Sequence, residues 1–285
     1  MLINKNKNIL IVGLGLIGGS YAKALHKTGF AVNAIDNKES SIEYALKEGF
    51  IDKGASTPDP ELIGAADIIV FALYPRLFRQ WIEEYQHLIK PGTYITDVTG
   101  VKTCIVDDIQ SILRDDLEFI SGHPMAGRES SGVENSDDTV FYGANFIIVP
   151  TDKNTEDGID VCRELALIMR FGRISILTPE EHDEMIGFVS QLTHCIAVSL
   201  MNCSDNEHLV DYVGDSFRDL TRIAKINENM WSELFMLNKT SLLKEMDQFI
   251  DEISVFRNMI ATDDIEGMKN KMINSTKRRV LFDKK

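Results

Sequence analysis

A β-branched run that leads directly into a glycine-rich turn is the feature that most constrains this fold. Asn8-Ile-Leu-Ile-Val12 has strand composition, and a helical pattern begins after the turn. Gly13 permits a tight turn, Gly15 lets a ligand approach the backbone, and Gly18 lets helix and strand pack closely. The helix N-terminus offers free N–H groups to an anion. We therefore predict a dinucleotide site formed by Gly13, Leu14, Gly15, Leu16, Ile17 and Gly18.

Asp36 narrows the choice of dinucleotide. It stands at the end of the second expected strand, where a carboxylate can accept hydrogen bonds from both ribose hydroxyls and would repel a 2′-phosphate. NAD is thus favoured over NADP, although Lys38 keeps NADP open. FAD uses the same glycine pattern, but the second half of the chain carries no flavin-type signal. A tight turn without any ligand is the remaining alternative.

Short apolar runs alternate with helical patterns over the first 177 residues. Such alternation predicts a Rossmann-like, doubly wound parallel sheet in an α/β domain. The expected strands are Ile9–Val12, Ala31–Ile35, Asp67–Leu73, Thr93–Val98, Glu118–Ser121, Phe146–Val149 and Arg173–Leu177.

The pattern changes at Thr178-Pro-Glu-Glu181, which has the residues of a helix-capping box. We find no further strand signal, so we expect domains at 1–177 and 178–285, the second all-α. Apolar residues recur at helical spacing from Asn229 to Ala261, on the order of 50 Å if the helix is continuous. A helix this long needs a second surface to bury its row of apolar side chains, which predicts a homodimer through the helical domain. The alternative is that two helices, Asn229–Asn238 and Ser241–Ala261, fold back on each other.

Composition excludes several classes of protein. Thirty basic and 44 acidic side chains give a net charge of −14, which argues against nucleic acid and anionic membranes as partners. We see no apolar segment of about 18 residues that would span a bilayer and no signal-peptide pattern. The four cysteines follow no disulfide framework, and the histidines form no metal-binding spacing. We expect a cytoplasmic protein without a metal.

Several unusual stretches follow expected strands and should meet at one rim, because ligands bind outside the carboxyl ends of a parallel sheet. Leu73, Tyr74 and Asp97 should contact the cofactor there. Gly122-His-Pro-Met-Ala-Gly127 would be a loop at the same rim, and we expect His123 beside the nicotinamide. An imidazole can take a proton from a hydroxyl while a hydride leaves the same carbon. A structural, hydrogen-bonded histidine is the alternative.

The sequence resembles the prephenate dehydrogenases of tyrosine biosynthesis over nearly its whole length. The resemblance is carried by Gly13–Ser20, Asp97–Lys102, Gly122–Ser130, Ser190–His194 and Phe217–Ala224, together with Met230, Trp231 and Asn238. It implies oxidative decarboxylation of prephenate to 4-hydroxyphenylpyruvate with hydride transfer to NAD⁺. It also implies a C-terminal dimerisation domain like that of 6-phosphogluconate dehydrogenase.

The resemblance further suggests roles for individual residues. Arg222 would bind the ring carboxylate, for which its planar fork is suited. His194, Trp231 and Lys102 would contact the substrate, and Glu129 would help to close the site. His194 and Trp231 could instead be core residues. The family serine near the catalytic histidine is Gly100 here, so the hydroxyl of Thr99 is the expected replacement.

Three rival functions remain open at this point. Arogenate or cyclohexadienyl dehydrogenases differ only in the side arm of the substrate. A 3-hydroxyacid-type dehydrogenase would rely on a lysine in the helical half, for which Lys225 is available. An NAD-sensing regulator would need no catalytic base. The chain offers no room for a separate regulatory domain, so any inhibition by tyrosine would act at the active site.

Overall fold

The computed structural model describes residues 3–128 and 130–282. Its first half contains a six-stranded parallel sheet in the order β3-β2-β1-β4-β5-β6. The strands are β1 Asn8–Val12, β2 Ala31–Ile35, β3 Lys53–Ala55, β4 Ile68–Phe71, β5 Tyr94–Asp97 and β6 Glu118–Phe119. The order reverses between β1 and β4, so the chain has the strand order of a dinucleotide-binding fold, as predicted.

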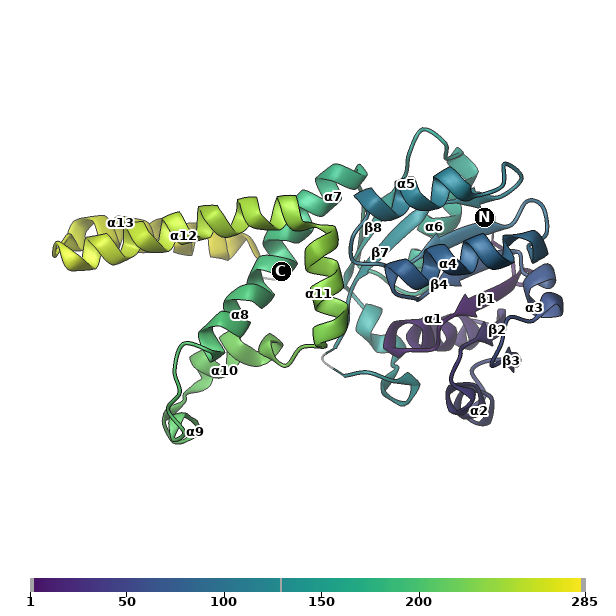
Figure 1. Ribbon diagram of the computed structural model, residues 1–285, viewed down its shortest axis with the longest axis horizontal. Helices are drawn as coiled ribbons and strands as arrows, with labels where there is room; N and C mark the ends of the chain where they lie inside the picture. The colour runs from purple at the N-terminus through teal and green to yellow at the C-terminus, as the bar shows by residue number, and fades with distance from the viewer. Residues whose placement is uncertain (1–2, 129, 283–285) are drawn as a thin grey trace.

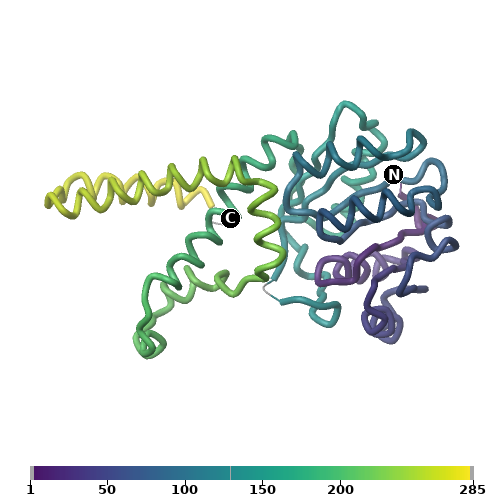
Figure 2. The backbone as a smooth tube through the Cα atoms, viewed as in Figure 1, coloured from purple at the N-terminus to yellow at the C-terminus, as the bar shows by residue number. Residues whose placement is uncertain are grey.

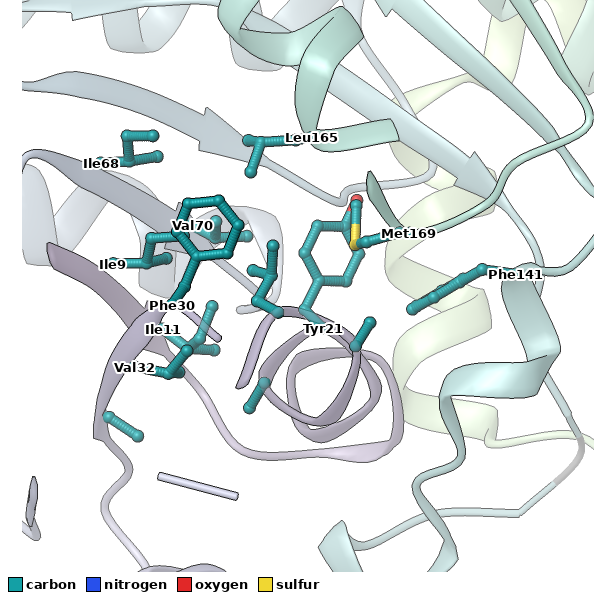
Figure 3. Packing of buried hydrophobic residues seen from close by; sticks show 14 of the residues in the cluster. Ile9, Ile11, Tyr21, Phe30, Val32, Ile68, Val70, Phe141, Leu165 and Met169 are labelled. Atoms are coloured by element: carbon teal, nitrogen blue, oxygen red, sulfur yellow. The ribbon is translucent and has the colours of Figure 1, made fainter. Parts of the chain in front are cut away.

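Helices cover both faces of this sheet (Figure 1). They are α1 Leu16–Lys27, α2 Glu39–Lys47, α3 Pro60–Ala65, α4 Pro75–Tyr85, α5 Thr103–Ile112 and α6 Glu156–Ile168. One core joins α1, α2 and α6 to one face, and the other joins α3, α4 and α5 to the opposite face. Figure 3 shows Tyr21 of α1 in the first core with Phe141 and Met169, and its ring meets that of Phe141 edge-on at 5.2 Å. These two cores fix the carboxyl ends of β1, β4 and β5.

The last strands of this half differ from the prediction of one parallel sheet. β7 (Ser121–Met125), β8 (Asn145–Val149) and β9 (Arg173–Ile176) form a separate three-stranded sheet, in which β7 runs antiparallel to β8. The stretch around His123 is therefore a strand and not the expected loop. Pro124 is tolerated there because β7 is an edge strand. Short 3₁₀ turns, η2 Val133–Asn135 and η3 Asp138–Phe141, connect β7 to β8.

The rest of the chain is helical, as expected. Its helices are α7 Pro179–Ile186, α8 Thr193–Met201, α9 Leu209–Tyr212, α10 Asp215–Thr221, α11 Glu228–Leu237, α12 Lys239–Ala261 and α13 Ile265–Arg279, with the 3₁₀ turn η5 Arg222–Ala224. The capping box at Thr178 and Glu181 is formed. Figure 2 shows α12 and α13 as a long hairpin that projects away from the nucleotide-binding half, while α11 lies beside that half.

The single helix expected from Asn229 to Ala261 is wrong. The chain turns at Asn238, which is the C-cap of α11 and the N-cap of α12. The side chain of Asn238 is buried and donates to the backbone oxygen of Asp183 at 2.8 Å and to Oε1 of Gln191 at 2.8 Å. α11 and α12 diverge in Figure 1, and α12 packs instead against α13. The alternative is right that two helices, α11 and α12, replace the single one, but these helices do not fold back on each other.

A longer helical stretch, Pro179–Met201, joins α7 and α8 through a π-helical turn, Gly187–Leu192. By length and hydropathy alone this stretch could cross a membrane, contrary to the expectation from sequence, and 28% of its apolar window is buried within the chain. Such helices also occur in the cores of soluble proteins. His182, Asp183 and Gln191 on it are buried and hydrogen-bonded to other parts of the protein. These contacts tie one side of the stretch to the rest of the protein, whereas Met185, Phe188 and Val189 on it are exposed.

Candidate active site

The glycine-rich turn leaves open space where a dinucleotide would lie. Gly13 has φ +98°, and a Cβ there would stand 2.5 Å from the carbonyl oxygen of Ala72. A Cβ on Gly18 would stand 1.9 Å from the oxygen of Gly13, whereas one on Gly15 would meet nothing within 4 Å. The first turn of α1 has no acidic residue and no side-chain cap. Its N–H groups, which include those of Leu16 and Ile17, are therefore suited to a pyrophosphate.

Asp36 links this turn to the end of β2. Its Oδ2 accepts from the backbone N–H of Leu14 at 2.6 Å, and its Oδ1 accepts from the N–H of Lys38 at 2.8 Å. The amide of Leu14 thus faces Asp36, so its direct contact with a cofactor is not supported. Each carboxylate oxygen keeps a second lone pair for a ribose hydroxyl. Leu73 and Tyr74 follow β4 at the reversal of strand order, as predicted, and Tyr74 is exposed.

Asp97, at the end of β5, is fully buried, and both of its carboxylate oxygens accept hydrogen bonds from neighbouring residues. Its Oδ1 accepts from Ser121 Oγ at 2.6 Å and Gly122 N at 3.1 Å. Its Oδ2 accepts from the N–H and hydroxyl of Thr99 and from Lys102 Nζ. The carboxylate of Asp97 is thus engaged within the protein, and the expected contact of this residue with the cofactor stays a prediction. The hydroxyl of Thr99 also belongs to this network, and its expected catalytic role stays a prediction.

Lys102 is equally enclosed, with no exposed side-chain surface. Its Nζ donates to Asp97 Oδ2 at 2.8 Å, to Thr99 Oγ1 at 3.2 Å and to the backbone oxygen of Gly122 at 2.7 Å. These acceptors use all three donors of an ammonium group. Burial lowers the pKa of Lys102, against the attraction of Asp97. This lysine therefore ties β5 to β7, and its expected contact with the substrate stays a prediction.

His123 extends from β7 towards α7, the first helix of the C-terminal half. Its Nδ1 lies 2.8 Å from Nε2 of His182, and Nδ1 of His182 lies 2.8 Å from Oδ1 of Asp183. Asp183 also accepts from the backbone N–H groups of Lys102 and Thr103, at 2.8 and 2.9 Å. A continuous hydrogen-bonded chain therefore runs from His123 to the N-terminus of α5.

The surroundings of this chain favour neutral imidazoles and an ionised carboxylate. Burial lowers the pKa of His123 well below its usual value, and His182 and Lys102 lower it further. Burial also lowers the pKa of His182, although its hydrogen bond to Asp183 opposes the shift. Burial alone would raise the pKa of Asp183, but hydrogen bonds from His182 and Thr103 outweigh it and lower that pKa. His123 is thus unprotonated at neutral pH and available as a base.

The other expected substrate residues gather on the helical half. The ring centroids of His194 on α8 and Trp231 on α11 lie 3.7 Å apart, and Nδ1 of His194 faces the backbone oxygen of Ser190 at 2.9 Å. Arg222 begins η5, which packs against α8, and it is exposed. Glu129 lies outside the described residues. His194, Trp231 and Arg222 therefore share one region of the helical domain.

Gly100 faces this helical domain. A Cβ on Gly100 would lie 3.6 Å from Cδ1 of Leu234 on α11, so that helix stands over the place where relatives carry a serine. No hydroxyl at this position orients His123. The sequence reasoning missed His182 and Asp183, which it weighed only as metal ligands. The only sign of them in the sequence is their position, because they lie on the inward face of α7 together with Ile186.

Comparisons with known proteins match both halves of the chain to the same family. Residues 21–170 match the model of the prephenate dehydrogenase nucleotide-binding domain, and residues 178–274 match the model of its dimerization domain. Prephenate dehydrogenase of Bacillus subtilis is 32% identical over 91% of this chain and 72% of its own length. Prephenate dehydrogenase of Lactococcus lactis is 34% identical over 87% of this chain and 71% of its own length.

Solved structures agree with this result. The crystal structure of prephenate dehydrogenase from Aquifex aeolicus in complex with hydroxyphenyl propionate and NAD⁺ superposes with a TM-score of 0.88. It is 30% identical and covers 97% of this chain and 98% of its own. The similarity therefore extends over both halves of the chain.

Proposed function

Because the chain belongs to the prephenate dehydrogenase family, we propose that it converts prephenate to 4-hydroxyphenylpyruvate and CO₂, with NAD⁺ as the oxidant. The observation that carries the proposal is His123. It is an imidazole held neutral by its surroundings, on the strand next to β5 and facing the helical domain. NAD⁺, when bound at the glycine-rich turn, accepts the hydride from C4 of the ring.

The residues of the chain supply the rest of the chemistry. His123 takes the proton of the C4 hydroxyl as the hydride leaves, and the oxygen becomes a carbonyl. Loss of CO₂ from C1 then returns its electron pair to the ring, which becomes aromatic. The phenolate oxygen regains the proton from His123. No net proton is released, and no metal is required for the loss of CO₂.

The helical domain would hold the two carboxylates of the substrate. Arg222 is the proposed clamp for the ring carboxylate, because a guanidinium can bind both oxygens of a carboxylate. His194 and Trp231 would form the wall beside it, and the close contact between their rings supports that placement. Asp36 favours NAD⁺ over NADP⁺ by charge repulsion with a 2′-phosphate. We propose the same division, 1–177 and 178–285, between cofactor and substrate domains.

We also propose that two copies of the chain pair through the helical domain. The hairpin of α12 and α13 carries exposed apolar side chains, including Ile250, Ile253, Ile260, Ile265, Met272 and Ile273. An exposed apolar surface of this kind is typical of a protein interface. Sedimentation velocity should show a dimer, and Ile253→Glu should weaken it. All four cysteines are free, which supports the cytoplasmic location that we propose.

The decisive assay presents prephenate and arogenate in parallel, each with NAD⁺ and with NADP⁺, and follows reduced cofactor and aromatic product. We expect the highest kcat/KM with prephenate and NAD⁺. A higher kcat/KM with arogenate would instead indicate that the protein is an arogenate dehydrogenase. If the folded protein binds NAD⁺ but turns over neither acid, the proposed function is wrong.

A further inference from the structure

We propose that His182 and Asp183 are positioning residues that hold His123 in one tautomer, with its proton on Nδ1 and its Nε2 unprotonated. The inference deepens the proposed function and rests on it for the role of His123 as the base. The tautomer itself is a property of the protein alone. It can therefore be measured whether or not prephenate is the substrate.

The assignment begins at Asp183. Its Oδ1 accepts from the backbone N–H of Lys102 at 2.8 Å, and its Oδ2 accepts from that of Thr103 at 2.9 Å. Both amides are fixed donors, so they favour an ionised carboxylate, which can only accept. His182 Nδ1, at 2.8 Å from Oδ1, must therefore carry a proton.

The remaining protons follow from this step. A neutral imidazole has one N–H, so His182 with its proton on Nδ1 presents a bare Nε2. Nδ1 of His123 lies 2.8 Å from that nitrogen and must donate to it. Nε2 of His123 is then left with its lone pair. That nitrogen is the one with which His123 can take a proton from a substrate hydroxyl.

The supports of His182 and Asp183 make the arrangement rigid. His182 is fully buried, and the capping box of Thr178 and Glu181 fixes the start of its helix. The backbone oxygen of Asp183 accepts from Asn238 at the junction of α11 and α12. Asp183 thus joins α5, α7 and the helices that cover the site. The orientation of His123 therefore depends on how the two domains meet.

The arrangement also accounts for the absence of a serine at residue 100. Gly100 has no hydroxyl to orient His123, and the hydroxyl of Thr99 is committed to the network of Asp97. His123 instead forms its side-chain hydrogen bond with His182. When His123 gains a proton, its Nδ1–H continues to donate to His182, and the carboxylate of Asp183 ends the chain with a negative charge. The same residues therefore orient the base and stabilise its cation.

The test compares His182→Gln with His182→Leu in the full-length protein. Glutamine can place its Oε1 near the position of Nε2 of the histidine and accept from His123, whereas leucine cannot. His26→Leu is the matched control, because His26 is partly exposed and pairs with Asp52 at 3.6 Å outside the site. Thermal melts of all variants report whether they fold.

Nitrogen-15 NMR of the histidine rings, with His123 assigned by His123→Asn, reads the tautomer directly. In the wild type and in His182→Gln we expect the proton on Nδ1 of His123. In His182→Leu we expect a mixture that includes protonated Nε2. A wild-type spectrum with the proton on Nε2, or a Leu variant with an unchanged tautomer, would overturn the proposal. The wild-type spectrum decides the matter even if the Leu variant does not fold.

Kinetics give a second measurement. His182→Leu should lower kcat for prephenate on the order of 10²-fold with little change in KM for NAD⁺, because a misoriented base slows the chemical step. His182→Gln should stay within about fivefold of the wild type, and His26→Leu should match it. Equal losses in the Gln and Leu variants would refute an orienting role. If no variant and no wild type turns over prephenate while the predicted tautomer is observed, the proposed function fails and the positioning role stands.

Discussion

Replacing Lys102 by methionine separates the two roles that have been considered for this lysine. Methionine keeps much of the buried volume and removes the ammonium group. The lost contacts are those to Asp97, Thr99 and the backbone oxygen of Gly122, and neither partner of the ion pair has any exposed side-chain surface. The variant leaves the carboxylate of Asp97 buried without its cation.

The expected cost can be estimated from this geometry. At 2.8 Å and an effective dielectric constant of about 20, the attraction between the two charges is about 6 kcal/mol. Desolvation offsets part of it, and breaking a buried pair by removing one partner typically costs about 3–5 kcal/mol. Asp97 keeps its hydrogen bonds from Thr99, Ser121 and Gly122, so we expect the lower end, about 3 kcal/mol. That corresponds to a Tm lower by roughly 6–12 °C.

The matched control is Lys90→Met. Lys90 Nζ lies 2.9 Å from Asp67 Oδ1, nearly the same separation, but its side chain is 37% exposed. Such surface pairs contribute about 0–1 kcal/mol, so Tm should fall by no more than roughly 4 °C. The double variant Lys102→Met with Asp97→Asn should lose less than the sum of the single changes, because neither charge is then left alone.

Thermal melts without ligand, together with steady-state kinetics, complete the assay. A contact between Lys102 and the substrate would instead raise KM for prephenate while Tm stayed near the wild-type value. If Lys102→Met is no less stable than Lys90→Met, the buried ion pair does not form in solution. That result would favour the sequence-based prediction of a contact between Lys102 and the substrate.

Three further predictions concern the site. His123→Asn should lower kcat by about 10²–10⁴-fold with little change in KM, and a variant that kept more than a tenth of the activity would exclude His123 as the base. Because the pKa of His123 is lowered by burial and by His182 and Lys102, kcat/KM should be flat from about pH 8 to 6.5 and fall only at lower pH. A fall that begins above about pH 7 would contradict this lowered pKa. Arg222→Ala should raise KM for prephenate far more than KM for NAD⁺, and equal effects on both would show that the carboxylate clamp lies elsewhere.

The nucleotide-binding half was predictable because its signals are local. The β-branched residues of β1, the turn at Gly13 and the cap at Thr178 each depend on a few consecutive residues, and each forms as expected. β3, with three residues, is too short for a periodic pattern. β7 was read as a loop because it contains Gly122 and Pro124. Its pairing with β8, about twenty residues away, is what makes it a strand.

The break between α11 and α12 could not be read from the sequence for a similar reason. Apolar residues continue at helical spacing through Asn238, and no proline or glycine marks an end. Asn238 instead uses its side-chain amide to bind Asp183 and Gln191, more than forty residues earlier in the chain. Hydrogen bonds to residues so distant in the sequence end the helix, and the spacing of apolar residues gives no sign of them.

In the candidate site, the sequence predicted where residues lie but not where their side chains point. Polar residues after β5 were expected at the rim of the sheet, and they are there, but strand ends do not determine where side chains point. Asp97, Thr99 and Lys102 turn inward and satisfy one another, because a buried charge must be paired. His182 was overlooked because it lies on a helix after the sheet and has no motif of its own. Its role depends on the approach of α7 to β7, so in our proposal the surface between the two domains decides which ring nitrogen of His123 carries the proton.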